Sequence, residues 1–140
     1  MSEDLTFVDS NILVYAYDVD SGPKHIRAKN AVAGLWRSQT GTVSIQVLQE
    51  FYVIVTRRLP KQLDARSARE VIATYQAWPV YSHNVSDVIS ASELEGNHAI
   101  GFWDALIVVA ARQSGCTRLL SEHLEAGQWI AGLQVFNPLL

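Results

Sequence analysis

The amino-acid sequence predicts an α/β protein whose central parallel sheet of about five strands is sandwiched between helices. Short β-like runs alternate with longer helical patterns along the 140 residues, and this alternation is typical of parallel strands joined by helices. Hydrophobic residues make up 49% of the chain and charged residues 18%, which is enough apolar material for one packed core. The sequence has no repeat, low-complexity tract or linker, so residues 1–140 are expected to form a single domain.

Strands are expected where short runs are rich in apolar and β-branched residues. These runs cover residues 5–9, 42–45, 80–82, 117–121 and 133–136. Helices are expected where longer segments carry apolar residues at helical spacing, over residues 11–17, 23–38, 46–59, 65–78, 87–98 and 102–114. Asp64 and Ser86 can cap the fourth and fifth helices, Pro60 ends the third, and Gly115 ends the last. In such a sheet ligands bind at the carboxyl ends of the strands, so polar residues there are candidate site residues.

The composition predicts a protein of the cytoplasm with no membrane partner. The single cysteine, Cys116, cannot form an intrachain disulfide and is interpreted as a small apolar residue. Residues 1–4 are acidic and lack the basic start of a secretory signal. The longest apolar run, residues 105–111, is far shorter than the ~18 residues that a membrane span requires.

The basic residues are concentrated in one short stretch. The net charge of −3 argues mildly against a nucleic-acid ligand, because nucleic-acid-binding domains are usually basic. However, Arg57, Arg58 and Lys61 lie together near the end of the helix predicted over residues 46–59. They are candidate contacts for the phosphates of an RNA, and the alternative is a solvated helical hairpin.

Three carboxylates lie at positions where local sequence rules do not expect them. Asp9 ends an apolar strand, Glu50 shares a helix face with apolar residues, and Asp104 opens a helix that is otherwise almost wholly apolar. Each also has a structural interpretation. Asp9 can cap the next helix, Glu50 can lie at an edge where it reaches water, and Asp104 can match the helix dipole. Because an unpaired carboxylate is costly to bury, three such acids in one small domain suggest a shared purpose.

A bound cation would explain such a group of acids, because several carboxylates cannot stay ionised together without one. Oxygen ligands favour Mg²⁺ or Mn²⁺, and the sequence has no zinc-like spacing of cysteine and histidine. Such an ion suits phosphate-ester chemistry, since it can hold a phosphate oxygen and lower the pKa of an attacking water. A phosphatase with an Asp-x-Asp nucleophile pair is disfavoured by Asp9-Ser10-Asn11, and a receiver domain is disfavoured because no lysine follows Lys61.

Four segments resemble the motifs of PIN domains, in the family's order and at fitting separations. They are residues 7–13, which carry Asp9, residues 44–52, residues 102–107 and residues 119–124. The resemblance covers nearly the whole chain and extends to the VapC-like toxins of toxin–antitoxin pairs. It implies a PIN-like fold and a Mg²⁺- or Mn²⁺-dependent endoribonuclease that cleaves single-stranded or looped RNA.

The resemblance also implies roles for individual residues. By motif match, Asp9, Glu50 and Asp104 are expected to be the catalytic metal ligands. Asn11 and Ser121 are expected to lie beside the metal and to orient carboxylates or water.

The fourth motif departs from the family pattern at His123, where an aspartate is usual. Glu122 and Glu125 are close enough in sequence to substitute, but in an extended segment Glu122 points opposite to His123. Glu122 and His123 are therefore expected to border the site, with His123 either a proton shuttle or a tolerated replacement. The departure also favours an alternative function, a degraded PIN domain that binds RNA or protein without cutting.

The family resemblance implies partners as well. A VapC-like ribonuclease is expected to form a homodimer and to be held inactive by a small antitoxin protein. Apolar and aromatic residues at Phe51, Tyr52, Val53 and Tyr75 exceed what one helical face can bury, so the antitoxin is expected to pack near them.

Overall fold

A computed structural model describes residues 4–140 of the chain. Residues 1–3, part of the acidic start in which no secretory signal is expected, lie outside the described residues. Among the residues that are described, no helix is long and apolar enough to cross a membrane.

The centre of the fold is a mostly parallel sheet with the strand order β3-β2-β1-β4-β6-β5. Its strands are β1 (Thr6–Val8), β2 (Gly41–Ser44), β3 (Val80–Tyr81), β4 (Arg118–Leu120), β5 (Trp129–Ile130) and β6 (Leu133–Phe136). β1 pairs in parallel with β2 and β4, while β5 runs antiparallel to β6 at one edge. The carboxyl ends of β1, β2 and β4 therefore meet at one edge of the sheet.

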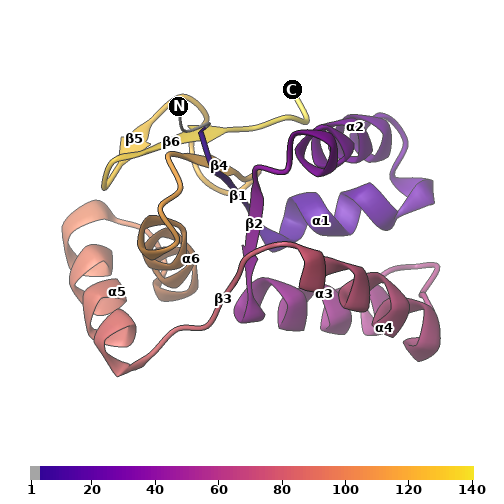
Figure 1. The fold of residues 1–140 in the computed structure, drawn as a ribbon, viewed down its shortest axis with the longest axis horizontal. Coiled ribbons are helices and arrows are strands. Elements are labelled where there is room, and N and C mark those ends of the chain that lie inside the picture. The colour runs from indigo at the N-terminus through magenta and orange to yellow at the C-terminus, as the bar shows by residue number, and fades with distance from the viewer. Residues whose placement is uncertain (1–3) are drawn as a thin grey trace.

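Helices cover both sides of this sheet. They are α1 (Ser10–Tyr17), α2 (Pro23–Ser38), α3 (Ile45–Arg57), α4 (Ala65–Thr74), α5 (Val85–His98) and α6 (Phe102–Gln113). Two short 3-10 turns, η1 (Val19–Ser21) and η2 (Tyr75–Ala77), follow α1 and α4. In Figure 1, α1 to α4 cluster on one side of the strands and α5 pairs with α6 on the other.

The predicted fold class is confirmed, and the element boundaries need three corrections. The sequence patterns predicted about five strands and did not predict the antiparallel strand β5. The described sheet therefore has six strands. The fourth helix ends at Thr74 and continues only as the 3-10 turn η2, because Pro79 follows closely. The fifth helix is capped by Asn84 and not by Ser86, since Asn84 and Asp87 form a reciprocal capping box.

Two of the four residues expected near the antitoxin, Phe51 and Tyr75, belong to the core. Phe51 and Tyr75 are both fully buried inside the chain, so neither is available to a partner. The Tyr75 ring packs edge-on against Trp78 with ring centroids 4.9 Å apart, and the Trp36 ring packs against both at a tilt. Tyr52 and Val53 of α3 are half-buried.

Candidate metal centre

Asp9 lies at the end of the central strand β1 and caps α1. Its Oδ1 accepts a hydrogen bond from the Ser10 backbone N–H at 2.7 Å, so the capping role expected from sequence is present. Its Oδ2 accepts a hydrogen bond from the Ser121 hydroxyl at 2.9 Å. The side chain is 3% exposed, so the fold buries this carboxylate and holds it in one orientation.

The pairing of β1 with β4 brings Ser121 to Asp9. Val8 lies opposite Leu120 in the parallel register, so the residue that follows each strand also faces the other. The Ser121 hydroxyl oxygen in turn accepts the His123 backbone N–H at 3.2 Å. Ser121 therefore links the Asp9 carboxylate to the backbone of the segment that carries His123.

Asn11 holds the same segment from the first turn of α1. Its Oδ1 accepts the backbone N–H of Glu122 at 2.9 Å, so this oxygen holds the loop after β4. Its Nδ2 is buried and has no hydrogen-bond partner among the described residues. Glu122 turns outward and pairs with Lys24 at 2.5 Å, which leaves Glu122 outside the group of acids.

Asp9, Asp104 and His123 come together in one cluster. One carboxylate oxygen of each aspartate and one ring nitrogen of His123 all lie within 4.8 Å of one another. Asp104 is half-buried in the first turn of α6, and His123 is exposed after β4. Such a donor set can hold a metal ion, and neutral imidazole suits Mn²⁺ better than Mg²⁺.

Glu50 faces the same centre from α3 but lies outside that 4.8 Å group. The Gln46 side-chain amide lies 3.5 Å from its Oε2 and 3.4 Å from the Trp103 backbone carbonyl, so it ties α3 to the start of α6. Gln46 was not recognised from the sequence. The structure buries this polar side chain to 5% exposure, whereas the sequence shows only a polar residue four positions before Glu50.

The electrostatics of the centre favour a bound cation. Burial raises the pKa of the Asp9 carboxyl, the charge of Asp104 raises it further, and the Ser121 hydrogen bond opposes both. Partial burial also raises the pKa of Glu50, as do the charges of Asp9 and Asp104. A cation would relieve this repulsion, so the residues present fit a divalent ion.

The basic residues predicted to contact RNA, Arg57, Arg58 and Lys61, are all exposed at or just after the end of α3. Arg57 ends α3 and Lys61 lies in the following loop. Arg58 caps α3 and lines a groove that also contacts Glu50 and His123.

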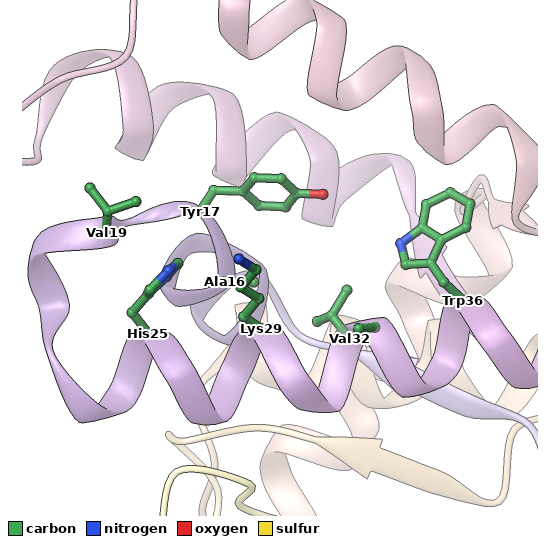
Figure 2. Close-up of a pocket in the computed structure, with 8 residues that line it drawn as sticks. Ala16, Tyr17, Val19, His25, Lys29, Val32 and Trp36 are labelled. Carbon is green, nitrogen blue, oxygen red and sulfur yellow. The ribbon is translucent and has the colours of Figure 1, made fainter.

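A second pocket of about 350 Å³ lies between α1, η1 and α2 (Figure 2). Tyr17, Val32 and Trp36 give it an apolar lining, and His25 and Lys29 line it as well. None of the cluster residues lines it, so it is separate from the acidic centre.

Together, the fold and the cluster define an α/β protein with an acidic centre at the carboxyl edge of its parallel sheet. The family model of the PIN domain matches residues 6–122, and the chain therefore belongs to the PIN-domain family, a family of nucleases. No curated protein sequence matches it.

Several solved structures are similar to this chain at low sequence identity. VapC20 of Mycobacterium tuberculosis, described as a Sarcin-Ricin loop cleaving toxin, is 23% identical, with a TM-score of 0.65 over 81% of this chain and 86% of that one. A toxin–antitoxin complex from Klebsiella pneumoniae is 16% identical, with a TM-score of 0.70 over 95% and 97%. VapBC2 of Rickettsia felis, bound to a fragment of promoter DNA, is 18% identical, with a TM-score of 0.63 over 94% and 96%.

Proposed function

We propose that this PIN domain is a metal-dependent endoribonuclease and the toxin of a toxin–antitoxin pair. The observation that carries the proposal is the cluster of Asp9, Asp104 and His123, with Glu50 facing it, at the carboxyl edge of the sheet. We also propose that residues 1–140 form this single domain and that it acts in the cytoplasm.

Asp9, Glu50 and Asp104 would hold a divalent ion, Mg²⁺ or Mn²⁺, with His123 at its border. When bound, such an ion polarises a phosphate oxygen and makes an attacking water more acidic. The protein's own contribution is to fix the ligands. Ser121 holds the Asp9 carboxylate, and Gln46 lies within hydrogen-bonding distance of Glu50. Water would then hydrolyse the phosphodiester bond whose phosphate lies beside the ion-binding carboxylates.

The proposed substrate is single-stranded or looped RNA. Its support is the exposure of Arg57, Arg58 and Lys61 next to the helix that carries Glu50. The similar fold of a toxin described as cleaving the Sarcin-Ricin loop adds to this support. Basic side chains in such positions can neutralise the phosphates of the strand on either side of the cut.

The proposed partners are an antitoxin protein and a second copy of the chain. Structures with the same fold are described as toxin–antitoxin complexes, some of them bound to DNA. Tyr52 and Val53, half-buried on α3, remain available to an antitoxin segment.

A second candidate function is a PIN domain that binds RNA or protein without cutting it. His123 favours this alternative, because it stands in the cluster where the resemblance leads one to expect an acid. Three acids hold divalent ions more weakly than four, and a weakly held ion would leave binding without catalysis.

Cleavage of bulk RNA separates the two functions. The wild-type protein is expected to cut RNA with Mg²⁺ or Mn²⁺ and to stop when EDTA is added. Asp104→Asn should lose at least about 100-fold in rate, because metal catalysis supplies several kcal/mol of stabilisation. Asp20→Asn, an exposed aspartate near the end of α1, is the matched control and should cut normally. RNA binding without metal-dependent cleavage would instead establish the second function.

A further inference from the structure

A groove of about 410 Å³ opens directly beside the acidic centre. Ser10, Glu50 and His123 line the end that borders the centre. The groove then follows α3 to its last residue and reaches Arg58. It is therefore continuous with the proposed metal site, and its far end is basic.

The face of α3 explains the shape of this groove. Glu50, Ile54 and Arg58 recur at four-residue spacing, so they lie in one row along the helix. Gln49 and Val53 form the neighbouring row at the same spacing. Arg58 follows Glu50 by about two turns, or about 12 Å along the helix axis. Between the acid and the arginine the groove thus has an apolar wall, made of Val53 and Ile54, with the Gln49 amide beside it.

The groups that follow one another along the groove match the parts of a nucleotide. The apolar wall suits the face of a base, the Gln49 amide can hydrogen-bond a base edge or a ribose hydroxyl, and Arg58 can neutralise a phosphate. Ligand pockets usually measure about 300–1,000 Å³, so this groove has room for one nucleotide.

We propose that this groove binds the nucleotide next to the scissile phosphate, with its base against Val53 and Ile54 and its outer phosphate on Arg58. The proposal rests on the proposed nuclease function and adds a substrate subsite to it. It also gives Arg58 a role that Arg57 and Lys61 do not share, because Arg58 is the one arginine or lysine among the described residues that lines this groove.

The test measures binding of a short fluorescein-labelled oligouridylate by fluorescence anisotropy, from about 50 to 200 mM potassium chloride. All proteins carry Asp104→Asn so that the RNA stays intact. Arg58→Ala should weaken binding about fivefold at 0.1 M salt and reduce the salt slope by about 0.7, the value for one phosphate contact on a single strand. Arg58→Lys keeps the charge and should keep most of the slope.

Arg112→Ala is the matched control for charge. Like Arg58, Arg112 is an exposed arginine near the end of a helix, about two turns after a site residue, here Asp104, but it does not line the groove. It should bind as the parent does. Equal losses for Arg58→Ala and Arg112→Ala would mean a general effect of charge and would overturn the subsite.

Val53 tests the position of the base. Its half-exposed side chain is not part of the hydrophobic core, so Val53→Ser should leave the fold intact. It should weaken oligouridylate binding about twofold to fivefold through lost apolar contact, with an unchanged salt slope. With an abasic oligomer of the same length, Val53→Ser should bind like the parent, while Arg58→Ala should still lose about fivefold.

The outcomes separate the subsite from the nuclease function. If the wild-type protein cuts RNA but the Arg58 and Val53 variants bind like the parent, the subsite is wrong and the nuclease function stands. That same result is expected if the groove instead receives an extended protein segment. If the Asp104→Asn parent does not bind RNA and the wild-type protein does not cut it, both proposals fail together.

Discussion

Divalent cations should stabilise the folded protein, and Asp9→Asn should remove most of that effect. Asp9 is buried and lies close to Asp104, so its negative charge is costly in the folded protein when no metal is bound. A cation that binds only the folded chain offsets this cost. At a free metal concentration of about one hundred times Kd, the gain is about 2.7 kcal/mol.

The size of the thermal shift follows from the length of the chain. Unfolding carries about 2.1 cal/mol/K of entropy per residue, which is about 0.3 kcal/mol/K for 140 residues. The midpoint Tm should therefore rise by about 9 °C with saturating Mn²⁺ or Mg²⁺. In Asp9→Asn the asparagine can keep a hydrogen bond to Ser10 and another to Ser121. The metal-free variant should thus be at least as stable as wild type, with a much smaller metal shift.

The pH dependence has a definite sign. In the folded protein the pKa values of Asp9 and Glu50 are raised, so the unfolded chain loses these protons first as the pH increases. The stability that these groups contribute is present in full below about pH 4, the range of the unfolded pKa values. It is lost as the pH rises through the raised folded values. The metal shift should therefore grow with pH over the same range.

Differential scanning calorimetry with EDTA, Mg²⁺ or Mn²⁺ measures all three effects. Glu93→Gln, which removes an exposed carboxylate from α5, is the control and should shift like wild type. If neither metal changes the wild-type Tm at any pH, the acids do not bind a stabilising cation. An Asp9→Asn variant with the full wild-type shift would also refute the reasoning.

Three other outcomes are expected. His123→Asp restores a fourth acid and should raise cleavage with Mg²⁺ relative to Mn²⁺, whereas an unchanged ratio would remove His123 from the site. A Cβ atom at Gly41 would lie 2.5 Å from the Trp78 ring, so Gly41→Ala should lower the free energy of unfolding by about 1–3 kcal/mol in urea titrations. A wild-type urea midpoint would show that the ring can move aside. Light scattering at micromolar concentration should give the mass of a dimer, and a monomer would contradict the proposed self-association.

The fold could be predicted from the sequence wherever the signals were local and repeated. Strand and helix patterns alternate clearly, and Pro60 and Gly115 mark helix ends that the structure reproduces closely. The strand β5 was not predictable in this way. It has only two residues, and the turn that joins it to β6 contains Ala131 with a φ of 53° and Gly132 with a φ of 87°. Such turns are usually marked by Asn-Gly or Asp-Gly, whereas this hairpin has Ala131-Gly132. Because alanine rarely adopts a positive φ, a turn there was not expected from the sequence.

The acids of the centre could be found because each one interrupts an apolar pattern. Their arrangement could not, because it depends on contacts between residues far apart in the chain. Ser121 reaches Asp9 through the register of β1 and β4, and Gln46 lies at the junction of α3 and α6. The position of His123 within 4.8 Å of both aspartates likewise depends on the path of the chain after β4.

The most direct test of the central claim is a crystal soaked in Mn²⁺ and measured by anomalous scattering. We expect a peak among the carboxylates of Asp9, Glu50 and Asp104, with His123 at its border. The peak should disappear in crystals of Asp9→Asn. A well-ordered centre without a peak at saturating Mn²⁺, or a peak bound elsewhere, would contradict the claim that these acids form a metal site.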